Sequence, residues 1–90
     1  MNNFNELNEV LSKLMNKANE FDLDVSLQVT TDGFKGLFML DPTRIEISND
    51  YISFGGCGVE IYADMPVAVS EVEDGLMWNV KGVTYEVDIS

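Results

Sequence analysis

The chain has 90 residues, 46% of them hydrophobic, and its 16 Asp and Glu against 5 Lys and Arg give a formal net charge of −11. This length and composition are typical of one globular domain. The chain contains no histidine and a single cysteine, Cys57. This excludes histidine-based nucleophilic catalysis, an intramolecular disulfide and a plausible structural zinc site. The acidity disfavours direct binding to nucleic acid or to anionic membranes.

The first segment has the periodicity of a helix, with apolar residues recurring at spacings of three and four. Asn3, followed three residues later by Glu6, is typical of a capping box. Glu9 and Lys13 are four residues apart, in the favourable order for an exposed ion pair. We therefore predict a helix over residues 3–21 with a buried stripe formed by Phe4, Leu7, Leu11, Leu14, Ala18 and Phe21.

The rest of the chain has the two-residue alternation of strands. Asp32-Gly33 and Lys81-Gly82 predict tight turns between strands, and Glu73-Asp74-Gly75 is interpreted as another turn. Residues 67–72 fit either a strand or a short helical turn. Strands are expected over residues 23–30, 36–40, 44–48, 51–54, 59–63, 76–80 and 83–89.

One helix followed by a run of strands is typical of an α+β domain. We expect a single domain over residues 1–90, with the N-terminal helix packed on one face of an antiparallel meander of about five strands. Residues 37–40 and 76–78 are apolar on both faces of their strands. Because one helix covers one face, the second face would expose Phe38, Met39, Met77 or Trp78 as a contact surface. The alternative is that these strands are central and a loop covers them.

No catalytic, cofactor-binding or metal-binding constellation is recognisable, so we expect a protein that is not an enzyme. Residues 55–58, Gly-Gly-Cys-Gly, lack the Lys-Ser/Thr that would follow in a phosphate-binding loop. Cys57 has no neighbouring cation to favour its thiolate and is interpreted as a small residue at a bulge. The carboxylates at 71, 73 and 74 lack the alternating spacing of a calcium loop.

The negative charge is concentrated in the second half of the chain, where residues 46–90 hold nine acids and one base, Lys81. Carboxylates fixed on strands could follow the charge of a nucleic-acid backbone, since duplex DNA carries about one charge per 1.7 Å. The alternative is that the acids keep a small hydrophobic domain in solution.

The C-terminal strand pair over residues 80–89, with its Gly-Val-Thr-Tyr segment at 82–85, resembles a hairpin in one inhibitor of a type II CRISPR nuclease. In size, charge and layout the chain is similar to small acidic phage-encoded inhibitors, including anti-CRISPR proteins that occupy the nucleic-acid channel of a nuclease. This resemblance implies binding without chemistry, in the cytoplasm of a phage-infected bacterial cell. A single cysteine and no recognisable signal peptide also favour an intracellular setting.

The sequence hypothesis is an acidic protein that binds and inhibits a basic nucleic-acid-binding protein, such as a CRISPR nuclease or complex, by occupying its nucleic-acid site. No cofactor is expected. The alternative is a structural or assembly module that forms a homodimer or docks on a partner protein, and a third is a small-molecule binder at residues 55–58. The predicted partner-binding residues are Glu46, Glu60, Glu71, Glu73, Asp74, Glu86, Asp88, Phe38 and Trp78.

Overall fold

Helix α1 spans Phe4–Glu20, close to the range that the sequence predicts. The buried stripe differs in two places, since Met15 is buried where Leu14 was expected and Phe21, the C-cap residue, is 61% exposed. Phe21 lies outside the helix and so cannot extend its stripe. The predicted ion pair forms, with Lys13 Nζ 3.3 Å from Glu9 Oε1.

The capping-box prediction at the start of α1 was wrong. Asn3 is the N-cap residue, but its side chain makes no capping hydrogen bond. Its backbone N–H instead donates to the carbonyl of Val67, 3.1 Å away on a strand of the main sheet. This bond ties the start of the helix to a sheet edge.

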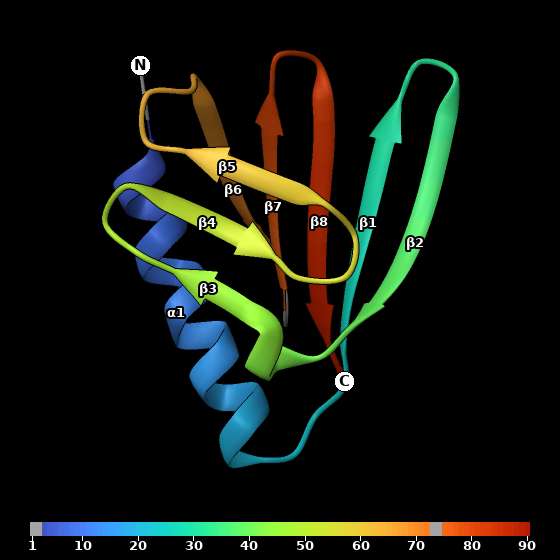
Figure 1. Ribbon diagram of the computed structural model, residues 1–90. Helices are drawn as coiled ribbons and strands as arrows, with labels where there is room; N and C mark the ends of the chain where they lie inside the picture. The colour runs from blue at the N-terminus through green and yellow to red at the C-terminus, as the bar shows by residue number, and fades with distance from the viewer. Residues whose placement is uncertain (1–2, 73–74) are drawn as a thin grey trace.

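The computed structural model describes residues 3–72 and 75–90 and shows an α+β fold with two sheets (Figure 1). The five-stranded sheet is antiparallel, in the order β2-β1-β8-β7-β6. The last strand pairs with the first, so the sheet is not the simple meander that we expected. Its strands are β1 (Val25–Thr31), β2 (Phe34–Leu40), β6 (Val67–Val72), β7 (Gly75–Val80) and β8 (Val83–Ile89).

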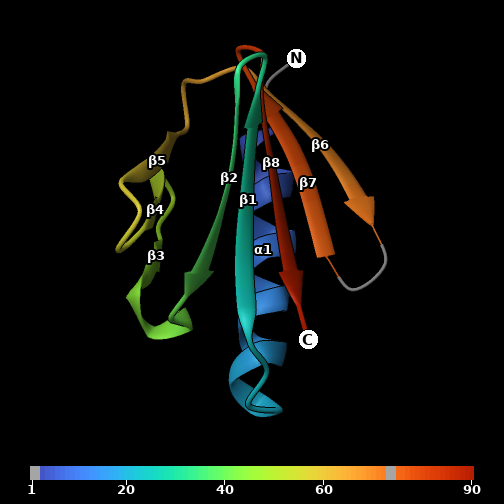
Figure 2. The same cartoon turned by 90° about the vertical axis from the view of Figure 1, so that its right-hand side faces the viewer.

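The middle of the chain leaves this sheet and forms a second, small antiparallel sheet in the order β3-β4-β5. A short 3-10 helix, η1 (Pro42–Arg44), leads into β3 (Ile45–Ile47), β4 (Tyr51–Phe54) and β5 (Val59–Tyr62). Figures 1 and 2 show α1 and the small sheet on the same face of the five-stranded sheet. Residues 67–72, which the sequence left open, form a strand.

The core lies between these two layers. Trp78 of β7 is stacked between Phe54 of the small sheet and Tyr85 of β8, with ring centroids 5.8 and 5.4 Å away. The Asn8 side chain of α1 donates to the Ser48 carbonyl at 2.6 Å and so joins the helix to the small sheet. Other core residues are Val25, Leu27, Ile52, Ile61, Val67, Leu76, Val80, Val87 and Ile89.

The opposite face of the five-stranded sheet has no covering element among the described residues. Leu37 and Met39 of β2 point to this face and are 67% and 69% exposed. The sequence predicts an uncovered sheet face with Met39 among its exposed residues, and Met39 is exposed there. In the described part of the chain, no helix is long and apolar enough to cross a membrane.

Gly55 allows the backbone of the small sheet to make a close contact at the end of β4. Its N–H donates to the carbonyl of Arg44 at 3.1 Å, and an added Cβ would lie 2.6 Å from that same oxygen. Gly55→Ala is therefore expected to lower the free energy of unfolding by about 1–3 kcal/mol. Gly33→Ala is the matched control, because nothing lies within 4 Å of its added Cβ. Urea unfolding of both variants measures the difference, and equal midpoints would contradict the prediction.

Candidate protein-binding surface

The outer face of the small sheet carries two rows of side chains that the strand register brings together. In the first row, Glu46 of β3 faces Ser53 of β4, which also faces Glu60 of β5. In the second row, Tyr51 faces Tyr62. Because Ile45, Ile47, Ile52, Phe54 and Ile61 alternate with these residues and pack toward the core, the two rows point away from it. We call these five outward residues the acidic tyrosine surface.

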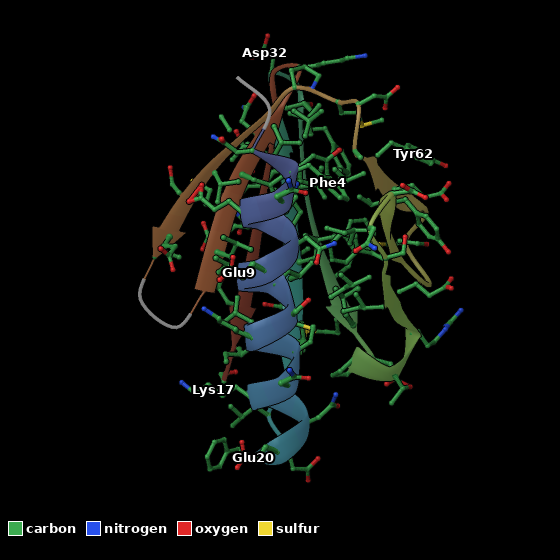
Figure 3. All side chains as sticks on the ribbon, turned by 90° about the vertical axis from the view of Figure 1, so that its left-hand side faces the viewer. Phe4, Glu9, Lys17, Glu20, Asp32 and Tyr62 are labelled. Carbon is green, nitrogen blue, oxygen red and sulfur yellow. The ribbon has the colours of Figure 1, made fainter. Side chains whose placement is uncertain are left out.

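Hydrogen bonds connect the tyrosines of this surface to its carboxylates. The Tyr51 hydroxyl donates to Glu46 Oε1 at 3.2 Å. The two tyrosine rings lie 6.4 Å apart at an angle of 41°, and Tyr62 is 42% exposed. Figure 3 shows Tyr62 on the small sheet, pointing away from α1.

The negative charge of this surface alters the ionisation of its phenols. The charge of Glu46, and then its hydrogen bond, raise the pKa of Tyr51 above the ordinary value. The charge and hydrogen bond of Glu60 do the same to the pKa of Tyr62. Both tyrosines therefore remain neutral hydrogen-bond donors at physiological pH, and only the carboxylates carry charge.

In the part of the chain that the structure describes, no basic side chain forms an ion pair with these carboxylates. Residues 45–80 contain no Lys or Arg, and no described cation forms an ion pair with Glu46 or Glu60. Asp50 and Asp64 add exposed charge at one end of the surface, where the N–H of Ala63 donates to the Asp50 carbonyl at 2.9 Å. Carboxylates beside exposed aromatic rings suit a guanidinium or ammonium group, which can stack on a ring and donate to the oxygens.

A second pair of carboxylates lies on the outer face of the five-stranded sheet. Glu86 and Asp88 are two residues apart on β8, a central strand, and their side chains share that face. A hydrogen bond with Asp88, burial and the charge of Asp88 raise the pKa of Glu86, and nearby Lys35 opposes the shift. Glu86 therefore keeps its proton to higher pH than an isolated glutamate does.

The raised pKa of Glu86 predicts a specific pH dependence of stability. A carboxyl group whose pKa is raised on folding stabilises the fold below its unfolded value, and this contribution is lost as pH rises through the folded pKa. Glu86→Gln removes the like-charge contact and is expected to raise Tm by about 2–4 °C at neutral pH. The gain should shrink toward pH 4 in thermal melts followed by circular dichroism. A gain that is the same at both pH values would contradict this account.

The structure does not bring the predicted carboxylates onto one surface. Glu46 and Glu60 lie on the outer face of the small sheet, whereas Glu86 and Asp88 lie on the opposite outer face of the molecule. Glu71 is exposed on β6 and lines a depression of about 270 Å³ together with Lys13 and Lys17 of α1. Glu73 and Asp74, the centre of the predicted turn, are outside the described residues, and Gly75 begins β7 and pairs with Val72 of β6.

The prediction that Trp78 lies at a contact surface was wrong, because it is 1% exposed. Its side chain points to the face of β7 that the small sheet covers. Phe38 also faces the interior and packs, partly buried, against the core. Leu37 and Met39, the neighbours of Phe38 on β2, are the large apolar residues exposed on the uncovered face among the described residues.

The sequence interpretation missed Tyr51, Ser53 and Tyr62. The signal was present in the alternation, because Tyr51 and Ser53 are two apart on one strand and Glu60 and Tyr62 are two apart on the next. Because large aromatic residues are usually buried to a large extent, tyrosines on short strands are easily interpreted as core residues.

The glycine-rich segment at 55–58 makes contacts that hold the turn between β4 and β5. The Cys57 thiol lies 3.4 Å from the carbonyl oxygen of Phe54 and is partly buried.

An open depression of about 380 Å³ separates this turn from the end of β2, with Asp41 and Arg44 at its border. The Thr43 hydroxyl, donating to Asp41, lowers the pKa of that carboxyl, and Asp41 caps η1. Among the described residues, no group of three potential metal ligands is present.

The fold and this surface define a small two-layer α+β protein with an acidic, aromatic face on its smaller sheet. No protein-family model, curated protein or solved structure matches the chain.

Proposed function

We propose that this chain is a non-catalytic binding protein that captures a basic segment of a nucleic-acid-binding protein and so keeps nucleic acid from that site. One observation supports this proposal above the others. Tyr51 and Tyr62 are flanked by Glu46 and Glu60 on a sheet that contains no Lys or Arg. Such a surface offers arginine or lysine side chains the two kinds of contact that they make best, a carboxylate and an aromatic ring.

The carboxylates of the acidic tyrosine surface and those on the rest of the molecule have different roles in this mechanism. Carboxylates spread over the molecule, including Glu71, Glu86 and Asp88, raise the rate of encounter with a basic groove because steering depends on total charge. The acidic tyrosine surface forms the close contacts, and these set the residence time. The association rate should therefore fall with added salt more steeply than the dissociation rate changes.

The resemblance to small acidic phage-encoded inhibitors supports a particular class of partner. Such a protein acts in the cytoplasm of an infected bacterium, where a CRISPR nuclease exposes arginines and lysines that hold nucleic acid. The geometry fits this class because the carboxylates are held on strands, so few side chains need to be ordered on binding.

A competition experiment tests the function. A fluorescent target duplex is bound to a guide-loaded type II CRISPR nuclease, and its anisotropy is followed as the protein is added before or after the duplex. We expect the protein to prevent duplex binding when it is added first, with a potency that falls as salt increases. Full duplex binding at a large excess of the protein, in low salt, would argue against this function.

A further inference from the structure

Strand β2 forms one edge of the five-stranded sheet, and no strand among the described residues pairs with its outer side. In the described ranges, no backbone hydrogen bond apart from the pairing with β1 reaches Lys35, Leu37 or Met39. Figure 2 looks onto this side of the molecule, and no other element crosses in front of β2. An edge strand of this kind is a template for pairing with another strand.

The other edge of the same sheet is protected. The backbone N–H of Asn3 donates to the Val67 carbonyl on β6, Pro66 precedes that strand, and Glu71 places a charge on it. Proline and charge are the usual devices that prevent edge pairing. β2 contains no proline and no acidic residue, and its single charge is Lys35, which opposes edge pairing unless an acidic residue of the second strand faces it.

The backbone of β2 is oriented for pairing at alternate residues. Thr31 and Phe34 close the β1–β2 hairpin, and the closing pair of a two-residue hairpin loop is hydrogen-bonded. Hydrogen-bonded pairs alternate along an antiparallel ladder, so Lys35, Leu37 and Met39 direct their N–H and C=O groups away from β1. The side chains of Leu37 and Met39 are about two-thirds exposed.

One antiparallel register makes this edge complementary to itself. When Leu37 pairs with Met39 of a second copy, Lys35 faces Asp41 of that copy, and the two-fold axis repeats both contacts. Asp41 follows β2 in an extended conformation, with φ −93° and ψ 116°. Thr43 donates to Oδ1 of Asp41 through both its N–H and its hydroxyl, which leaves Oδ2 for the lysine.

We propose that β2 pairs with β2 of a second copy in this register, joining two five-stranded sheets into one continuous antiparallel sheet. In a protein of net charge −11, two copies repel each other over most of their surface. Residues 33–40 carry a single positive charge and no negative one, so this edge can approach its own copy. The dimer also covers the exposed side chains of Leu37 and Met39. The acidic tyrosine surface is on the other sheet and takes no part in the pairing.

Sedimentation velocity over micromolar to millimolar concentrations tests this dimer. We expect wild-type protein to dimerise reversibly and Leu37→Pro to be monomeric, because proline removes a donor that faces the second copy and leaves the bonds to β1. In Lys35→Asp, the new aspartate of each copy faces Asp41 of the other copy. These two repulsive contacts should raise the dimer Kd by roughly 10-fold or more. Lys81→Asp is the matched control, with the same charge change at a distant turn, and should behave as wild type.

Mixing two charge variants tests the register itself. Lys35→Asp and Asp41→Lys each oppose like charges in their own homodimers, but together they restore both pairs of opposite charges. We expect heterodimers to dominate in native mass spectrometry of the mixture, after circular dichroism has shown both variants folded. A wild-type monomer at millimolar concentration, or a dimer equally stable in Lys35→Asp and Lys81→Asp, would overturn the proposal. Random mixing of the two variants would overturn the register.

Discussion

Trp78→Ala is expected to lower the free energy of unfolding by about 3–5 kcal/mol. Trp78 is buried between Phe54 of the small sheet and Tyr85 of β8, so its removal leaves a cavity where the two layers meet. A domain of this size has a total stability of about 5–13 kcal/mol. The variant should therefore be close to unfolding at physiological temperature.

Two further variants separate the cavity from other effects of this substitution. The Trp78 indole N–H is buried without a hydrogen-bond partner among the described residues, so Trp78→Phe should cost only about 1–2 kcal/mol while keeping a stacked ring. Tyr62→Ala removes an aromatic ring from the surface and should change stability by less than about 1 kcal/mol. Urea unfolding followed by circular dichroism compares the three variants. A Trp78→Ala cost no larger than that of Tyr62→Ala would contradict the packing described here.

The double substitution Glu46→Lys and Glu60→Lys is expected to weaken binding to the basic partner by about 100-fold or more. The change replaces two attractive contacts by repulsive ones beside Tyr51 and Tyr62, at the centre of the proposed contact area. Stability should change little, because both carboxylates are exposed. Surface plasmon resonance at several salt concentrations measures the association and dissociation rates separately.

A second double variant controls for net charge. Glu6→Lys with Glu20→Lys changes the charge by the same amount on α1, where both residues are exposed. We expect it to slow association and to leave the dissociation rate close to that of the wild type. If both double variants lose the same affinity, total charge alone determines binding and the acidic tyrosine surface has no special role.

Local patterns in the sequence predict the elements of this fold well. The helix range, the turns at Asp32-Gly33 and Lys81-Gly82, and the inward face of β8 all follow from short-range periodicity. The pairing of β1 with β8 and the separation of β3, β4 and β5 into their own sheet do not follow from it. These depend on contacts between distant segments, and strands of three or four residues have the same alternation in either sheet.

Because local patterns do not show contacts between distant segments, only some of the site residues could be predicted. The alternation along each strand predicts that Glu46 and Glu60 point outward. It does not indicate that their strands belong to a different sheet from that of Glu86 and Asp88. Trp78 was assigned to a free face because a helix was the only covering element that the sequence revealed. The small sheet covers it instead, and that sheet becomes visible only when the tertiary arrangement is known.

A nuclear magnetic resonance titration with an arginine-rich peptide locates the residues at which this protein binds guanidinium groups. Amide chemical shifts of the labelled protein are followed at physiological salt as the peptide is added. We expect the largest changes at the five residues of the acidic tyrosine surface and small changes at other exposed acids such as Glu6, Glu20 and Asp32. Changes of similar size at every exposed acid, or changes confined to Glu86 and Asp88, would contradict this expectation.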